Sequence, residues 1–167
     1  MTFVKDQQHQ PEIVQGVLGW DITLQILGEV ASQGSKTLTR WGSMREASKK
    51  LMPWRYSIQY ATEQQYQGPL LTGPVEMEVE FLFLRPWKQW STAAGKEGQL
   101  VPSAPIHHTK MPDVDKCLRA LLDGLSAKCG GNVLKDDSIV FRVNCTKRYA
   151  ARNESTGAIV RLRSMEG

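Results

Sequence analysis

The sequence has little of what marks a membrane, secreted or zinc-binding protein. It contains no unbroken apolar stretch of the ~20 residues that a transmembrane helix needs, and its first residues lack the apolar core of a signal peptide. Its three cysteines (Cys117, Cys129 and Cys145) are an odd number without the spacing of a metal site. We therefore expect a cytoplasmic protein with reduced thiols and no membrane association.

Nucleotide and zinc sites also lack support. Residues 32–36 form a turn of small residues followed by Lys36, but without the spacing of a P-loop, so no nucleotide cofactor is expected. Backbone N–H groups and the ammonium of Lys36 could bind a phosphate there, although an ordinary loop is the simpler explanation. His107 and His108 are adjacent, without partnering cysteine or histidine, so zinc binding is not supported either.

The chain has the size and composition of a single globular domain. It has 167 residues, of which 41% are hydrophobic and 23% are charged. We expect a disordered, glutamine-rich tail over residues 1–12 and one domain over residues 13–167. The net charge is only +4, but residues 36–55 and 138–167 each contain six basic residues. Such clusters fit a phosphate-bearing partner, and basic surfaces kept for solubility are the alternative.

Hydrophobic periodicity predicts a small mixed sheet with two main helices packed on it. Alternating residues predict strands over residues 17–27, 75–84, 139–147 and 158–163. Helical spacing predicts one helix from Pro53 to about Gly68, with Trp54, Ile58 and Ala61 buried, and another over about 113–127. This order of elements places the fold in the α/β class, with α+β as the alternative.

Each predicted strand has an apolar and a polar face. Over residues 75–84, Glu76, Glu78 and Glu80 alternate with apolar residues, and a solvated outer face explains them better than catalysis. In the strand over residues 139–147, four side chains are expected to point toward the core: Ile139, Phe141, Val143 and Cys145. Arg161 and Arg163 on the last strand point outward, as is typical of a protected sheet edge.

Residues 87–112 show no periodicity and are rich in glycine and proline. A connection of this length without secondary structure is unusual in a compact domain, which favours a functional loop. The loop carries Lys88, Lys96 and Lys110 against a single acid, Glu97, so contact with nucleic acid is a candidate role.

Aspartates cluster around the second predicted helix. Asp113 and Asp115 open the helix, and Asp136 and Asp137 follow the Gly-Gly turn at residues 130–131 that ends it. Mg²⁺ prefers carboxylate oxygens and keeps several waters, so one to three carboxylates are enough to bind it. We predict a divalent-metal site formed by Asp113 and Asp115, to which the turn returns Asp137 as a third ligand.

A metal in this position suits phosphodiester chemistry, because it can polarise a phosphoryl oxygen and activate a water molecule. Arg119 or Lys147 would offset the charge that develops on the phosphate. Structural explanations remain for the same residues. Asp113 fits a helix N-cap, and Asp115, Arg119 and Asp123 fit an ion-pair ladder at i, i+4 and i+8.

Residues 110–125, KMPDVDKCLRALLDGL, followed by DDSIV from Asp136, closely resemble the signature of the RusA family of Holliday junction resolvases. Three further segments are similar to that family. They are QGSK at residues 33–36, PWR at residues 53–55 and KRY at residues 147–149. The resemblance spans roughly residues 24–162, and the aspartate-rich stretch is its most specific part.

The resemblance implies a homodimeric, Mg²⁺-dependent endonuclease that cuts four-way DNA junctions, with Mn²⁺ as a substitute metal. It implies that Asp113, Asp115 and Asp137 are catalytic and bind the metal, with Asp136 beside them. A basic residue in the site is usually lysine in this family and is Arg119 here, while Lys116 replaces a frequent asparagine. The expected DNA contacts are Lys36, Lys110, Lys147 and Arg148. A two-fold dimer suits paired cuts because it presents two equivalent sites.

Two other functions compete with this one. A basic DNA-binding or junction-binding module without catalysis would use the acids only as caps and ion pairs. The presence of Asp113, Asp115 and Asp137 together argues against it. An unrelated Mg²⁺-dependent phosphohydrolase acting on nucleotides is the third reading, and it lacks a loop that could cradle the phosphates.

Overall fold

The computed structural model describes residues 20–34, 36–42, 44–46 and 49–165. The predicted tail over residues 1–12 lies outside this part of the chain. In chain order, the strands and helices are β1 (Ile22–Leu27), β2 (Lys36–Leu38), β3 (Met44–Glu46), α1 (Leu51–Gln65), β4 (Val75–Phe83), α2 (Val114–Leu125), β5 (Val140–Tyr149) and β6 (Gly157–Ser164). Single 3-10 turns occur at Trp87–Gln89, Ala127–Cys129 and Asp137–Ile139.

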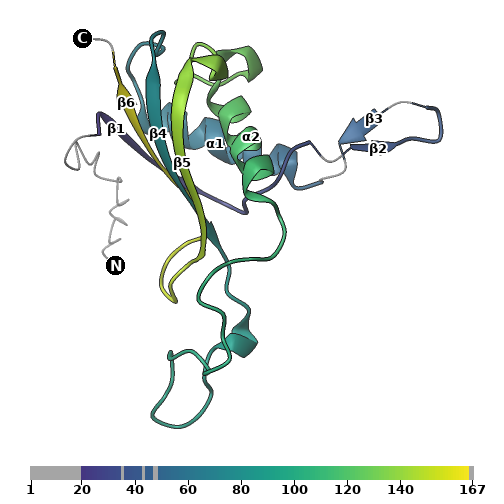
Figure 1. Cartoon of the computed structure of the whole chain (residues 1–167), viewed down its shortest axis with the longest axis vertical. Helices are drawn as coiled ribbons and strands as arrows, with labels where there is room; N and C mark the ends of the chain where they lie inside the picture. Colours follow the sequence, from purple (N-terminus) through teal and green to yellow (C-terminus); the bar gives the residue numbers. More distant parts are fainter. Residues whose placement is uncertain (1–19, 35, 43, 47–48, 166–167) are drawn as a thin grey trace, which may run out of the picture.

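Four strands form the main sheet in the order β1-β6-β4-β5 (Figure 1). β4 and β5 are parallel, and β6 runs antiparallel to both β1 and β4, so the sheet is mixed. The chain passes from β4 to the parallel β5 through α2, because parallel strands need a crossover connection. Both helices contribute to the hydrophobic core that packs on the sheet. The predicted mixed sheet with two main helices is confirmed.

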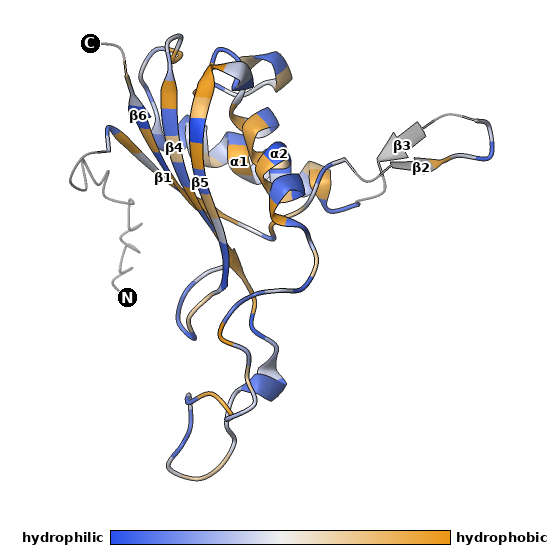
Figure 2. Cartoon of the chain, viewed as in Figure 1, coloured by the Kyte–Doolittle hydropathy of each residue, from blue (hydrophilic) through white to orange (hydrophobic). Residues whose placement is uncertain are grey.

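The core forms where the apolar faces of the strands meet the two helices. Alternate residues of β1, β4 and β6 are fully buried, and Figure 2 shows the corresponding alternation of hydrophobic and hydrophilic residues along the strands. Trp54, Ile58 and Ala61 of α1 are buried as predicted. The two helices approach closely at Gly124, where an added Cβ would come within 2.8 Å of Ile58 Cδ1. The helix positions are therefore set by side-chain packing against the sheet and against each other.

The predicted orientation of Phe141 in β5 is wrong. The register between β4 and β5 shifts so that Val75 pairs with Val140, but Glu76 pairs with Arg142. Phe141 is the extra residue and is 55% exposed, while Val140 and Val143 pack against the core. Since side chains alternate with a period of two, one extra residue changes which residues of the strand face inward.

The polar face of the sheet also differs from the prediction. β6 lies between β1 and β4, so its arginines do not protect an edge. Arg161 Nη1 lies 2.6 Å from Glu78 Oε1 and 3.0 Å from Glu80 Oε1. Glu76 binds Arg142 on one side, at 3.2 Å, and Arg163 on the other, at 3.3 Å. The glutamates of β4 are therefore neutralised by arginines of both neighbouring strands, where we expected them to be only solvated.

Two segments project from the body of the protein (Figure 1). β2 and β3 pair as an antiparallel hairpin, which periodicity did not predict. The loop over residues 87–112 contains one 3-10 turn and isolated bridges, in agreement with the predicted irregular connection. Arg85 fastens the start of this loop, because it lies over the Tyr149 ring at 4.1 Å and donates to Gln89 Oε1 and the Pro105 carbonyl.

The three cysteines are free thiols, as predicted. Burial raises the pKa of Cys117 to about 12 and that of Cys145 to about 11, so both thiols stay protonated at neutral pH. Across the described residues, no helix combines the length and the apolar character that a membrane crossing requires.

Candidate active site

The N-terminal end of α2 carries the first two predicted ligands. Asp113 occupies the N-cap position with an extended backbone, but its side chain makes no capping hydrogen bond. Its Oδ2 instead lies 3.0 Å from Lys116 Nζ. Asp115 is exposed in the first turn, where the helix dipole favours a negative charge, and no described basic side chain forms an ion pair with it. Both carboxylates are thus accessible to a ligand from solution.

Lys147 of β5 supports the segment that leads into Asp113. Its Nζ donates to the carbonyl oxygens of Lys110 and Pro112, at 2.8 and 2.7 Å. These bonds tie the end of the long loop to the sheet and use two of the three ammonium donors. We infer that Lys147 positions Asp113. A direct contact between Lys147 and DNA stays a prediction.

Arg148 lies on the polar face of the sheet. Its Nε donates to Glu80 Oε2 at 3.0 Å, and its two terminal nitrogens donate to the carboxylate of Glu154 at 2.7 and 2.8 Å. The hydrogen bonds from Arg148 hold the pKa of Glu154 at about 2. To bind a DNA phosphate, Arg148 would have to exchange these partners, so its predicted DNA contact has no support in the geometry.

A polar cluster joins the residues before Lys36 to both helices. Arg55 Nη2 of α1 donates to Asp123 Oδ2 of α2 at 2.9 Å and to Gln33 Oε1 at 2.6 Å, and Gln33 Nε2 also donates to Asp123. The backbone N–H of Gln33 donates to the Lys116 carbonyl at 3.1 Å. The turn that we considered for phosphate binding therefore lies against α2, near Asp115.

The ion-pair ladder that was the alternative explanation for the acids of α2 does not form among the described residues. Asp123 takes its partners from Arg55 and Gln33, and within the described part of the chain Arg119 forms no ion pair with Asp115 or Asp123. Arg119 is exposed one turn after Asp115, and an added Cβ at Gly34 would lie 3.4 Å from its Nη1. Its side chain is thus exposed one helical turn from Asp115.

For the two other predicted DNA-binding cations, Lys110 and Lys36, the structure gives no contact that bears on this role. Lys110 is exposed at the end of the long loop, three residues before Asp113. The backbone of Lys36 belongs to β2, but its side chain lies outside the described residues. Their contacts with DNA stay predictions.

Asp137 lies at the opposite end of α2 from Asp113. Asp136 pairs with Lys128, just past the helix, and Leu134 bridges to Ser126 at its C-terminal end. A helix of 12 residues is roughly 18 Å long. The Gly-Gly turn thus reverses the chain at the far end of α2 and does not return Asp137 to Asp113, contrary to our expectation. Over the residues that the structure describes, no three or more acids, histidines or cysteines form a metal-binding group.

Asp113 and Asp115 by themselves fit a hard divalent cation. Both present carboxylate oxygens to solvent, and Mg²⁺ commonly binds through one or two carboxylates while it keeps several waters. The metal-binding roles of Asp113, Asp115 and Asp137 and the catalytic role of Arg119 stay predictions.

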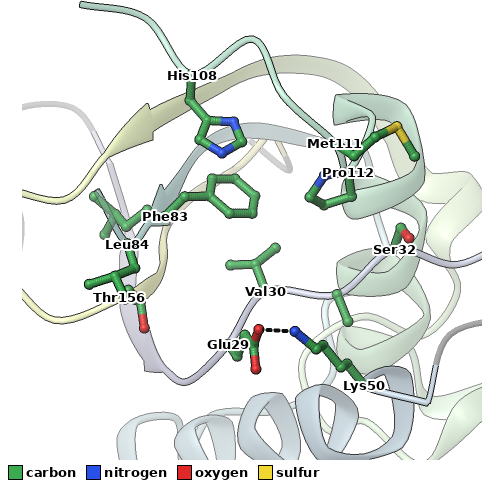
Figure 3. Close-up of a pocket in the computed structure, with 12 residues that line it drawn as sticks. Glu29, Val30, Ser32, Lys50, Phe83, Leu84, His108, Met111, Pro112 and Thr156 are labelled. Atoms are coloured by element: carbon green, nitrogen blue, oxygen red, sulfur yellow. Dashed lines mark hydrogen bonds and ion pairs between the residues drawn. The ribbon is translucent and has the colours of Figure 1, made fainter. Parts of the chain in front are cut away.

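A cavity beside this site escaped the sequence analysis. It opens next to Pro112, and its lining includes Val30, Phe83 and His108 (Figure 3). These residues come from segments far apart in the chain, so no local pattern could have connected them.

Of the comparisons with known proteins, one identifies a family. A search of curated proteins gives no significant match. The sequence profile of the family described as endodeoxyribonuclease RusA matches residues 28–162. This range begins just after β1 and contains α1, α2, β4, β5, most of β6 and every predicted site residue. Because this match covers most of the chain, the protein belongs to the RusA endodeoxyribonuclease family.

Proposed function

We propose that this protein is a Mg²⁺-dependent endonuclease that resolves four-way DNA junctions by paired, symmetric cleavage. The observation that carries the proposal is the accessible pair of carboxylates, Asp113 and Asp115, at the start of α2 in a member of this family. Helix-end carboxylates that a basic protein needed only for stability would be expected to cap the helix or to pair with arginines.

Each nearby residue has a role that follows from its position. Asp113 and Asp115 would hold Mg²⁺, which when bound polarises the phosphoryl oxygen and lowers the pKa of water. Arg119, exposed one turn beyond Asp115, would place a permanent positive charge near the phosphate and offset the charge that develops on it. Lys147 would keep Asp113 in place through its bonds to the loop backbone.

The position of Asp137 favours a dimer. In one chain Asp137 lies about one helix length from Asp113. If two copies pack with their α2 helices antiparallel, the C-terminal end of each helix meets the N-terminal end of the other. Asp137 of a second copy would then join Asp113 and Asp115, and the two-fold axis would create two equivalent sites for two cuts.

A junction-binding module without catalysis is the alternative. On the sheet, arginines and glutamates pair with each other, as expected in a protein whose charged residues only stabilise the fold. The exposed Asp115 argues against it, because an unpaired carboxylate repels DNA phosphates unless a cation binds to it.

The test compares a four-way junction, a flap and a linear duplex, each with and without Mg²⁺. We expect symmetric nicks on opposite strands of the four-way junction, only with the metal, and little cleavage of the duplex. Tight junction binding without cleavage in Mg²⁺ or Mn²⁺ would favour the binding module. Binding to none of the branched substrates would contradict both.

A further inference from the structure

A cavity of about 710 Å³ opens beside Pro112, the residue before Asp113 (Figure 3). Its volume lies in the range of small-molecule sites, roughly 300–1,000 Å³. Seven of the twelve lining residues are apolar: Val30, Ala31, Leu82, Phe83, Leu84, Met111 and Pro112. Glu29 and Lys50, which pair with each other, supply a hydrogen-bond acceptor and a donor at one side. The cavity therefore suits a flat apolar group with a polar edge.

One wall of the cavity is aromatic. The His108 ring stacks on Phe83 with centroids 4.2 Å apart and an interplanar angle of 20°, and it meets the edge of Tyr149 at 4.8 Å. His108 is only 8% exposed, and burial and the nearby Lys147 ammonium lower its pKa. The imidazole is thus neutral at pH 7, and the wall offers uncharged, fixed rings for stacking.

The cavity is directly connected to the start of α2. Pro112 lines it, and the next residue is Asp113. The bonds from Lys147 to the Lys110 and Pro112 carbonyls fix this edge of the cavity relative to the aspartates. A DNA strand whose phosphate lies at Asp113 and Asp115 would carry its neighbouring nucleotide past the cavity mouth.

We propose that the cavity binds one unpaired nucleobase of the DNA, from a nucleotide that flanks the scissile phosphate. This inference rests on the proposed nuclease function and adds a base-binding subsite to it. A base would stack on the aromatic wall, as bases do in single-strand-binding proteins, with its polar edge toward Glu29 and Lys50.

The subsite explains selectivity for branched DNA. A base inside a duplex must be unpaired and unstacked before it can enter a pocket, whereas a base at a branch point has already lost part of its pairing and stacking. Filling the cavity would hold the adjacent phosphate at Asp113 and Asp115. Junctions would therefore be aligned for cleavage more readily than linear duplex.

The experiment measures binding in EDTA, where cleavage cannot interfere, to junctions that each lack one base near the branch point. For the wild-type protein we expect one such abasic position to weaken binding about tenfold. Thr156 lines the cavity, so Thr156→Trp should fill it. This variant should bind the intact junction about tenfold more weakly and become insensitive to the abasic site. The exposed neighbour gives the matched control, Ser155→Trp, which should behave as the wild type.

A second variant keeps the test valid if Thr156→Trp fails to fold. Met111 lines the cavity but is 69% exposed, so Met111→Ala should fold normally. In this variant the loss of junction affinity caused by the abasic site should be severalfold smaller than in the wild type. Equal abasic effects in the wild type and both cavity variants would overturn the proposal, as would a junction with no sensitive position. A third outcome would also overturn the proposal: a cavity variant changes its oligomeric state, while an abasic site still weakens its binding to the junction. The cavity would then receive a side chain of a second copy of the protein.

The two proposals fail in different ways. If the wild-type protein binds and cuts junctions but ignores every abasic position, only the base-binding subsite is wrong. If it binds no branched DNA, the nuclease function is wrong and the subsite with it.

Discussion

Two acidic regions of this protein look similar in the sequence and differ in the fold. The glutamates of β4 lie between β5 and β6, and Arg142, Arg148, Arg161 and Arg163 from these strands pair with them. Asp113 and Asp115 lie at the exposed start of α2, where the only described basic side chain paired with either is Lys116. One region is a balanced ion-pair network, and the other leaves Asp115 without an ion-pair partner among the described residues.

This difference separates structural acids from candidate ligands. Each partly exposed ion pair on the sheet contributes on the order of 0.2–1 kcal/mol, and a bound cation would have to displace the arginines to reach the glutamates. At α2 a cation would relieve repulsion between neighbouring carboxylates instead. Alternating glutamates on a strand thus stabilise the sheet, whereas the pair of aspartates at a helix start fits a metal site.

The sharpest way to test this comparison is to neutralise one acid of each kind. Asp115→Asn should lower the cleavage rate at least about a hundredfold while junction binding persists, because a lost metal ligand removes several kcal/mol of stabilisation. Asp137→Asn should have a similar effect. Glu78→Gln, on the sheet, should cleave at close to the wild-type rate. The measurement is the single-turnover rate on a four-way junction.

Mixing the two inactive variants tests where Asp137 acts. If Asp137 of one copy completes the site of the other, a dimer of Asp115→Asn with Asp137→Asn contains one intact site, and nicking should return. If each site is built from one chain, the mixture stays inactive. Full cleavage by Asp115→Asn alone would refute the metal site itself.

A smaller effect should follow from Lys116, whose ammonium lies 3.0 Å from Asp113 Oδ2. Its pKa is raised by the hydrogen bond and by the charge of Asp113, so it stays charged and competes with a metal for this carboxylate. We expect Lys116→Asn to bind Mn²⁺ about two- to fivefold more tightly, measured by calorimetry without DNA. Lys110→Asn makes the same charge change three residues before Asp113. An equal gain in Mn²⁺ affinity in Lys110→Asn would show that the affinity depends only on net charge and not on the contact between Lys116 and Asp113.

Local patterns explain which parts of the fold were predictable. β4 and β6 alternate regularly, so both strands and their buried residues followed from the sequence. The bulge at Phe141 did not, because the residues alternate without interruption and only the pairing with β4 shifts. The interior place of β6 also depends on pairing between distant strands, so its arginines looked like edge residues.

In the candidate site too, local features could be predicted and contacts between distant residues could not. Asp113 and Asp115 belong to one short motif at a helix start, so local spacing was sufficient to place them. The partner of Asp123 is Arg55, 68 residues away, and no helical spacing could have found it. The position of Asp137 follows from the length of α2, which carries the turn about 18 Å from Asp113. Sequence spacing thus suggested candidate ligands by residue type but could not establish that they meet.

The smallest expected effect concerns acid stability of the balanced region. Arg148 holds the pKa of Glu154 at about 2, below its ordinary value of 4.5, so the folded protein binds this proton more weakly than the unfolded chain does. The pair therefore stabilises the fold above about pH 4.5, and this contribution declines as the pH falls toward 2. Glu154→Gln should lower the free energy of unfolding by about 0.5 kcal/mol at pH 7, roughly 1–2 °C in Tm. Melting curves from pH 7 to pH 3 should show this difference shrinking below pH 4.5, and a constant difference would mean that the Arg148 pair does not depend on the charge of Glu154.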